Sequence, residues 1–356
     1  MKEPVYFLKL ELENVRSFGK NATLDLSDGN DHWKKWTVIL GDNGTGKTTL
    51  LQAILGFKPQ KISLTPNRPG EIENPYVSFL TLRTDIEISF NVFIKESSEK
   101  SILVRISSTF VLKNGDKVAW GYGQSKSGSN ISRSKIIDGK LAGNLFILGY
   151  GANRLMSTNS ITESKTENPE TLFNDEAKLI NAEEWLLQLD YAASKDSDIK
   201  SFAETKRNQV KQILIDLLPD VEEIRFSTPT KENLKSSVEF KTPFGWVTIH
   251  QLSLGYKTMV VWMVDLAARM FERYPDSDNP LAEPAIVLVD EIDLHLHPKW
   301  QRKIFDYLSD KFPQAQFIVT AHSPLVVQSA PKDANIVVLR KDDDRVVIDN
   351  DIKSVQ

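Results

Sequence analysis

The sequence predicts an α/β protein built on a mixed central sheet. Three observations lead to this prediction: short apolar strands recur along the chain, helical patterns alternate with them, and a glycine-rich loop joins one such strand to a helix. Strands that are apolar along their whole length are typical of the buried centre of a parallel sheet. The clearest of these runs lie at residues 36–40, 145–150, 285–289 and 316–320.

The first 120 residues predict mainly strands. Residues 5–12 and 23–26 come close to alternating apolar and polar side chains, and residues 48–57 predict a helix ending near Gly56. Residues 76–120 predict an antiparallel β subdomain, with Asn114-Gly115 as a hairpin turn. Residues 121–134 are rich in Gly, Ser and Lys, and we expect an exposed loop there.

The middle of the chain predicts two helices, over residues 179–193 and 199–217, because apolar residues recur there at helical spacing. Each spans only about twenty residues, too few heptads for a long coiled coil. Strands follow from residue 238, with Phe244-Gly245 as a turn, and then a helix over residues 256–271. We expect a further helix from Pro298 to about Lys311 and a closing hairpin over residues 336–348.

Composition narrows the classes of protein that fit. The 356 residues carry 44 Lys and Arg against 48 Asp and Glu, and 40% are hydrophobic, which is ordinary for a soluble globular protein. The absence of cysteine excludes disulfides, thiolate metal sites and cysteine nucleophiles, and fits a reducing compartment. The longest apolar run, residues 259–264, is far shorter than the roughly twenty residues of a membrane span, and no signal-peptide core follows Lys2. We therefore expect a cytoplasmic protein without a membrane partner.

One stretch is basic, although the net charge of the whole chain is negative. Residues 100–140 contain eight Lys or Arg and two Asp. Two interpretations stay open: lysines protecting an exposed strand edge, or a contact face for nucleic acid or an acidic partner.

The residues from Gly41 to Thr48 match the pattern G-x-x-x-x-G-K-[ST], between a predicted strand and a predicted helix. In such a loop, backbone N–H groups surround phosphates, and the positive end of the helix dipole adds to the attraction. We expect Lys47 to contact the β- and γ-phosphates of ATP, Thr48 to hold Mg²⁺ and Thr49 to lie at the α-phosphate. The remaining cradle residues are Asn43, Gly44, Thr45 and Gly46.

Two acids, Asp290 and Glu291, follow the apolar strand at residues 286–289. In a parallel α/β sheet, ligands bind at the carboxyl ends of the strands. We expect Asp290 to complete the Mg²⁺ shell and Glu291 to polarise water towards the γ-phosphate, a contribution of roughly 10²–10⁴ in rate.

The run Leu252-Ser253-Leu254-Gly255 lies at a predicted helix start, and Ser253 precedes Asp290 by 37 residues. With this run the chain resembles ABC-type ATPases, whose signature L-S-x-G precedes a helix and then the acidic strand. The resemblance implies that Ser253 and Gly255 reach the γ-phosphate bound by the other protomer. Leu254 stands where the second glycine is usual.

Further residues match the same family. Asp293 resembles the D-loop residue that lines the dimer seam, and His322 resembles the switch histidine that contacts the γ-phosphate. Arg16 matches the strand-turn of the RecF and SMC branch, where a basic residue lies near the nucleotide. For His295 and His297, a metal site with Asp290 is the weaker interpretation, and we favour His297 as a helix-start residue.

The Q-loop residue stays open. No glutamine stands at residues 149–154, where the family has one. Asn153 or Arg154 are the candidate substitutes, and Gln124 is a poorer one.

The stretches "LENVRSFG", "DEIDLHLHP" and "TAHSP" resemble the RecF, SMC and OLD-like branch, and "LGYGANR" is similar to AAA-annotated ATPases of Septu-like and retron-like anti-phage modules. The resemblance implies an ABC-type head: an ATPase lobe with the antiparallel β subdomain at 1–160, a helical insertion at 161–240, and the second ATPase half at 241–356. It also implies ATP and Mg²⁺, a homodimer or higher oligomer, and a separate effector of the nuclease kind. Only 34 residues follow His322, so we expect no nuclease within this chain.

Two alternatives remain. One is an ATPase of DNA repair, recombination or chromosome organisation, for which nucleic acid is a ligand. The other is a transporter motor, which the spacing of 206 residues between Lys47 and Ser253 disfavours.

Overall fold

The computed structural model describes twelve stretches of the chain. They are residues 4–13, 15–19, 21–30, 32–56, 87–96, 103–113, 116–126, 145–160, 171–218, 220–229, 231 and 235–350. These residues fall into two compact units. Unit 1 comprises Met1–Ala152, Pro284–Asp293 and Gln314–Gln356, and unit 2 comprises Asn153–Glu283 and Leu294–Pro313. The three-part domain division expected from the sequence stays a prediction.

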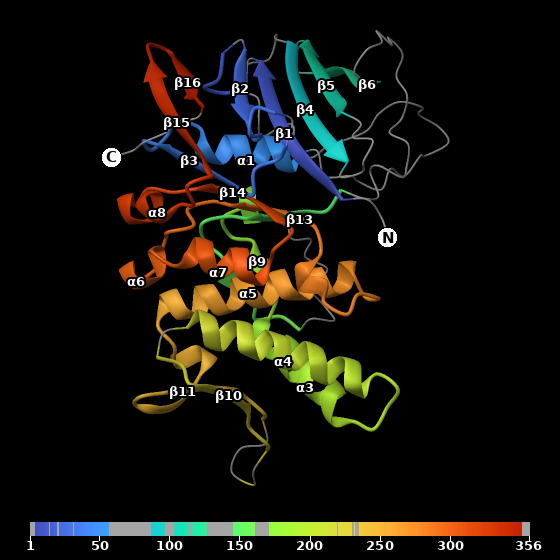
Figure 1. The fold of residues 1–356 in the computed structure, drawn as a ribbon, viewed down its shortest axis with the longest axis vertical. Coiled ribbons are helices and arrows are strands. Elements are labelled where there is room, and N and C mark those ends of the chain that lie inside the picture. Colours follow the sequence, from blue (N-terminus) through green and yellow to red (C-terminus); the bar gives the residue numbers. More distant parts are fainter. Residues whose placement is uncertain are drawn as a thin grey trace. The chain divides into compact units, whose positions relative to one another are not determined.

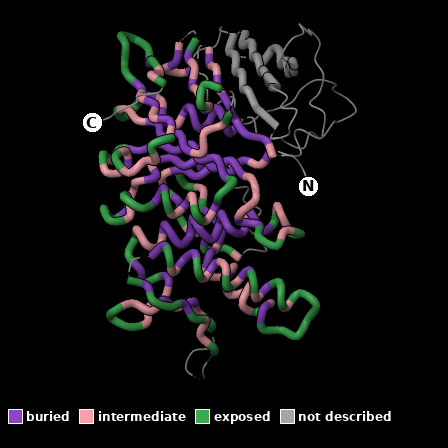
Figure 2. Tube along the Cα trace, in the orientation of Figure 1, coloured by how far each residue is buried: buried purple, intermediate pink, exposed green. Residues whose placement is uncertain are grey.

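The core of unit 1 is a six-stranded mixed sheet with strand order β16-β15-β3-β14-β13-β7. Its strands are β3 (Trp36–Gly41), β7 (Ile147–Tyr150), β13 (Ala285–Val289), β14 (Ala315–Thr320), β15 (Asn335–Asp342) and β16 (Arg345–Asp349). All neighbouring pairs are parallel except β15 with β16, which form the closing hairpin. β7, β13 and β14 are buried along their whole length (Figure 2), as their apolar sequences predict.

Parallel pairing brings the strand ends of unit 1 to one edge of this sheet. Val289 stands opposite Val319 and Tyr150, and Thr320 stands opposite Ile39. Helix α1 (Lys47–Leu55) follows β3, and Gly56 closes it, as predicted. The short helix α8 (Pro324–Ser329) follows β14. The glycine-rich loop, the two acids and His322 therefore all follow strands that end at this edge. Figure 1 shows β3, β13 and β14 together in unit 1.

A second sheet in unit 1 has the order β2-β1-β4-β5-β6 and is antiparallel throughout. Its strands are β1 (Val5–Glu13), β2 (Ala22–Asp25), β4 (Glu87–Glu96), β5 (Leu103–Lys113) and β6 (Asp116–Lys126). The predicted antiparallel β subdomain is confirmed in these strands. Residues 76–86 of the predicted subdomain lie outside the described residues, and so do all side chains of the basic stretch at 100–140.

The loop predicted from residue 121 is wrong in its first part. β6 continues to Lys126, where Gly121 stands opposite Thr109 and Lys126 opposite Val104. The ladder that the long strand β5 offers outweighs the turn-favouring composition of this segment. Residues 127–134 lie outside the described residues.

Unit 2 is mainly helical. Its long helices are α3 (Ala182–Ser194), α4 (Lys200–Leu217) and α5 (Leu254–Arg273). Three strands form an antiparallel sheet of order β10-β11-β12, namely β10 (Glu223–Phe226), β11 (Val238–Thr242) and β12 (Gly245–Thr248), and the short strands β8 (Leu155–Met156) and β9 (Lys178–Leu179) pair in parallel. The remaining elements are the 3-10 helices η3 (Ile249–Gln251) and η4 (Pro280–Ala282) and the helices α6 (Pro298–Gln301) and α7 (Ile304–Lys311).

α5 is the buried centre of unit 2, with residues 258–268 buried without interruption (Figure 2). α3 and α4 pack against each other as an antiparallel pair of 13 and 18 residues. Within the described part of the chain no longer coiled coil is present, as expected. Among these same residues, none of the helices has the length and apolar character needed to cross a bilayer.

The single helix predicted from Pro298 to Lys311 is instead two helices. The backbone N–H of Lys303 donates to the carbonyl of Trp300 at 2.9 Å, a tight turn that interrupts the α-helical pattern between α6 and α7. Trp300 and Tyr307 meet edge to face across this break, with ring centroids 5.8 Å apart.

Candidate functional site

The loop between β3 and α1 carries the residues that the sequence predicts to bind phosphate, 43–46. Gly44 and Gly46 have φ of 78° and 91°, in the left-handed region that side chains rarely adopt. A Cβ at Gly46 would also lie 2.8 Å from a ring carbon of Phe18, whereas one at Gly44 would meet nothing within 4 Å. Gly46 forms the N-cap of α1, and the phosphate contacts expected of residues 43–46 stay a prediction.

Lys47 lies across this loop. Its Nζ donates to the carbonyls of Gly41 at 2.7 Å and Asp42 at 2.9 Å, and the residue is 7% exposed. Burial lowers the pKa of Lys47, while the negative charges of Asp290 and Glu291 act in the opposite direction. Its ammonium group is therefore held by backbone carbonyls of the loop itself.

Thr48 and Asp290 meet, although 242 residues separate them. Thr48 Oγ1 donates to Asp290 Oδ2 at 2.7 Å. Parallel pairing in the order β3-β14-β13 brings the residues that follow β3 and β13 to the same edge. A hydroxyl and one carboxylate oxygen at this distance suit Mg²⁺, which takes one or two carboxylates and completes its shell with phosphate oxygens and water.

Glu291 begins the turn after Asp290 with φ of 47°, an unusual conformation for a side-chain-bearing residue. Its backbone N–H donates to Thr320 Oγ1 at 2.7 Å. The Thr320 hydroxyl in turn donates to Asp290 Oδ1 at 2.5 Å. Sequence reasoning treated Thr320 only as a strand end, although a threonine closing the strand after the acidic one was a signal for this contact.

Asp293 and His322 lie side by side in unit 1. The carboxylate of Asp293 accepts the backbone N–H of His322 at 3.0 Å and that of Ser323 at 2.6 Å. The imidazole Nε2 of His322 lies 3.9 Å from Glu291 Oε1, and the two side chains are 37% and 34% exposed. Two of the predicted catalytic groups therefore face each other, and Asp293 holds the turn that carries one of them.

Arg16 lies at the first turn of α1. Its Nη1 donates to Thr49 Oγ1 at 3.4 Å, and its φ is 48°. Burial lowers the pKa of the guanidinium, and its Nε has no hydrogen-bond partner among the described residues. The structure thus brings Arg16 beside a predicted nucleotide-binding residue 33 positions later in the chain.

The signature residues belong to unit 2. Ser253 is the N-cap of α5, where its side chain accepts the N–H of Tyr256 at 3.5 Å. The first turn of α5 carries no acidic side chain that would offset the positive end of the helix dipole. A Cβ at Gly255 would collide with the backbone carbonyl of His295. The expected contact of Ser253 and Gly255 with a second copy stays a prediction.

His297 is a helix-start residue, as favoured from the sequence. Its Nδ1 accepts the N–H of Lys299 at 3.3 Å, at the N-cap of α6. His295, two residues earlier, has φ of 64°, and its carbonyl oxygen lies close to Gly255.

The two leading Q-loop candidates differ in their surroundings. Asn153 is exposed and donates to the carbonyl of Asp175 at 3.3 Å. Arg154 is 2% exposed, and its guanidinium lies over the ring of Trp262 on α5, 5.3 Å from the centroid. Arg154 is therefore the candidate that contacts the helix carrying the signature. The side chain of Gln124 lies outside the described residues.

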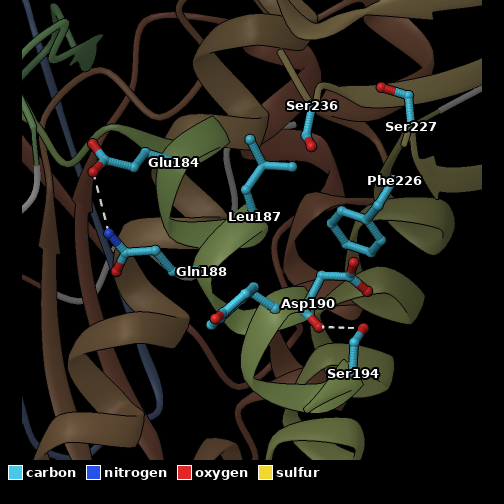
Figure 3. Close-up of a pocket in the computed structure, with 9 residues that line it drawn as sticks. Glu184, Leu187, Gln188, Asp190, Ser194, Phe226, Ser227 and Ser236 are labelled. Carbon is cyan, nitrogen blue, oxygen red and sulfur yellow. Dashed lines mark hydrogen bonds between the residues drawn. The ribbon is translucent and has the colours of Figure 1, made fainter. Parts of the chain in front are cut away.

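Cavities are also present among the described residues of unit 2. One, of about 380 Å³, lies at the start of α5 and is lined in part by Ser253, Gly255 and Trp300. Another, of about 640 Å³, lies between α3 and β10 (Figure 3), and none of the predicted site residues lines it. Figure 3 shows Leu187 and Phe226 extending into it from α3 and β10.

The family follows from a comparison with family models. Residues 36–328, from β3 to α8, match the family described as "AAA domain, putative AbiEii toxin, Type IV TA system". The chain belongs to this AAA-domain family. The match spans the phosphate loop, the signature, both acids and His322.

Two curated relatives and one solved structure agree with this family. The chain is 29% identical over 346 residues to the Septu protein PtuA of Bacillus mycoides (strain KBAB4), covering 95% of this chain and 41% of PtuA. It is 26% identical over 358 residues to the "Retron Vc95 probable ATPase" of Vibrio cholerae serotype O1 biovar El Tor, covering 84% and 68%. The SMC head solved with the C-winged helix domain of ScpA superimposes with a TM-score of 0.57 at 19% identity, over 97% of each chain.

The predicted ABC-type head fold is confirmed by the likeness to this SMC head. The resemblance to Septu and retron ATPases is confirmed by the two relatives. The chain spans less than half the length of PtuA.

Proposed function

We propose that this chain hydrolyses ATP in the presence of Mg²⁺, within a dimer that closes on the nucleotide and thereby controls a separate effector. The observation that supports hydrolysis most directly is the contact between Thr48 and Asp290, because it unites the phosphate loop with the acidic strand end. Membership of the AAA-domain family supports the nucleotide as ligand.

The residues have distinct roles in this proposal. Lys47 and the backbone N–H groups of residues 43–46 bind the β- and γ-phosphates, with Thr49 and Arg16 at the start of α1. Glu291 takes a proton from the attacking water, and His322, 3.9 Å away, holds the γ-phosphate end of the site.

Thr48 and Asp290 are the residues that would hold Mg²⁺. When bound, the ion neutralises charge on the β- and γ-phosphates. The hydroxyl and carboxylate are already 2.7 Å apart, so little rearrangement of the two side chains is needed.

The dimer is proposed because the resemblance to ABC-type ATPases implies that Ser253 and Gly255 of one copy reach the γ-phosphate bound by the other. Ser253 starts a 20-residue helix whose positive end carries no acidic side chain. A γ-phosphate bound by one copy and contacted by Ser253 and Gly255 of the other would hold the two copies together. Hydrolysis removes that group and opens the dimer.

A role in anti-phage defence is the proposed context. It rests on the resemblance of "LGYGANR" to ATPases of defence modules and on relatives named for Septu and retron systems. In this proposal the effector is a separate protein of the nuclease kind, and opening or closing of the dimer regulates it.

The test is the mass of the protein in solution, measured by size-exclusion chromatography with light scattering, with and without ATP and Mg²⁺. We expect Glu291→Gln to accumulate as an ATP-bound dimer, because it binds but does not hydrolyse. Lys47→Ala should remain unbound and monomeric. Ser253→Ala should bind ATP without dimerising. If Glu291→Gln binds ATP but has the same monomeric mass as Lys47→Ala, the dimer proposal is wrong.

A further inference from the structure

Thr320 forms hydrogen bonds to both acids of the site, Asp290 and Glu291. It is the last residue of β14 and is 0% exposed. Its single hydroxyl donates to Asp290 Oδ1 at 2.5 Å and accepts the backbone N–H of Glu291 at 2.7 Å. One side chain therefore contacts both residues that the proposed function places at the metal and at the attacking water.

The contact to Asp290 fixes how its carboxylate is turned. With Oδ1 bound to Thr320, Oδ2 is the oxygen that faces Thr48, at 2.7 Å. Groups that hydrogen-bond to a metal-binding carboxylate set its orientation and its affinity for the ion.

The contact to Glu291 fixes its backbone. Glu291 has φ of 47°, a conformation that costs energy for any residue with a side chain. The bond from its N–H to Thr320 Oγ1, together with the bond from the N–H of Ile292 to the carbonyl of Thr320 at 3.0 Å, holds the turn in this conformation. The conformation of this turn sets the direction in which the Glu291 side chain leaves the backbone.

We propose that Thr320 is a positioning residue, whose hydroxyl orients Asp290 for Mg²⁺ and Glu291 for water. This inference rests on the proposed function. It predicts that ATP hydrolysis depends on the hydroxyl of residue 320 and not on the volume of its side chain. Thr320→Val preserves the shape and removes the hydroxyl, while Thr320→Ser preserves the hydroxyl.

The sheet supplies a matched control in Thr37 of β3. Thr37 is also 0% exposed, and its hydroxyl has no hydrogen-bond partner among the described residues. Thr37→Val therefore removes a buried hydroxyl from the same sheet without removing a bond to either acid.

The first measurement is steady-state ATP hydrolysis. We expect Thr320→Val to lower kcat roughly 10- to 100-fold and to raise the Mg²⁺ concentration for half-maximal rate, the range seen when a group supporting a metal ligand is removed. KM for ATP should change less than about threefold, because Lys47 and the phosphate loop are untouched. Thr320→Ser and Thr37→Val should keep kcat within about threefold of the wild type.

The second measurement needs neither nucleotide nor metal. Hydrogen–deuterium exchange of the segment covering Glu291 and Ile292 in the free protein should be faster in Thr320→Val and unchanged in Thr320→Ser and Thr37→Val. Should Thr320→Val not fold, Thr320→Ala takes its place in both measurements.

The inference is overturned if Thr320→Val shows wild-type kcat, wild-type Mg²⁺ dependence and wild-type exchange. It is also overturned if Thr37→Val loses as much activity as Thr320→Val, since the effect is then general to the sheet. A wild-type protein that does not hydrolyse ATP sinks the proposed function instead, and the exchange measurement then decides whether Thr320 holds the turn.

Discussion

At the scale of single residues, two glycines in the phosphate loop have different reasons to be glycine. Gly44 and Gly46 both have positive φ, but only Gly46 is crowded, by the ring of Phe18 and the hydroxyl of Ser17. Replacing Gly44 costs backbone strain alone, about 1–2 kcal/mol. Replacing Gly46 adds a steric clash of about 1–3 kcal/mol.

We therefore expect Gly46→Ala to lower the free energy of unfolding more than Gly44→Ala does. Thermal or urea unfolding of the two variants measures the difference without any ligand. Equal destabilisation would show that the ring of Phe18 moves aside without lowering the free energy of unfolding.

Lys47 gives a prediction about pH. Burial lowers the pKa of Lys47 below the ordinary lysine value of 10.5, and only the charged ammonium attracts phosphate. ATP affinity is then fully present below the pKa of Lys47 and is lost as the pH rises through it. We expect the loss at a lower pH than an ordinary lysine would give.

The measurement is the Kd of a fluorescent ATP analogue between about pH 7 and 10. Lys47→Arg is the control, because a guanidinium stays charged over that range, so its affinity, whatever its absolute value, should not show the alkaline loss. Parallel pH curves for the wild type and Lys47→Arg would contradict the prediction.

At the scale of elements, two effects oppose each other at the start of α5, namely helix propensity and steric packing. Alanine favours a helix over glycine by about 1 kcal/mol. At Gly255, however, a Cβ would meet the backbone carbonyl of His295, which cannot move aside as a flexible side chain could. Leu254, the preceding residue, is 56% exposed.

We expect Gly255→Ala to be destabilising by about 1–3 kcal/mol despite the better propensity. Leu254→Ala at the exposed neighbouring position should change the free energy of unfolding by less than about 0.5 kcal/mol. Chemical unfolding of both variants is the measurement. A Gly255→Ala variant more stable than the wild type would show that the carbonyl of His295 is not fixed.

At the scale of the whole molecule, the proposed dimer makes a prediction that one variant cannot test. Lys47→Ala removes the phosphate side of a composite site, and Ser253→Ala removes the signature side. Each variant alone should be inactive. A mixed dimer, however, pairs the intact phosphate loop of one copy with the intact signature of the other, so it holds one complete site.

Because neither variant is expected to dimerise alone, every dimer in an equal mixture should be a mixed one with one complete site of two. Mixing should therefore restore up to roughly half of the wild-type rate. The rate of phosphate release against mixing ratio is the measurement. Activity that stays at the level of the separate variants would place Ser253 outside any shared site.

The sequence by itself determined the strands and helix around this site and the list of its candidate groups. Apolar strands such as β13 and the spacing of the loop before α1 are local patterns, and local patterns fix where a strand ends and which residues follow it. The meeting of Thr48 with Asp290 could also be expected, because both follow parallel strands of one sheet.

Only the tertiary structure decided how these groups hold one another. The bonds of Thr320 to Asp290 and Glu291, and of Asp293 to the backbone of His322, join residues about thirty positions apart. They depend on the register between β13 and β14, which no local pattern encodes. The extension of β6 and the collision that keeps position 255 a glycine have the same origin, because each is set by a partner distant in sequence.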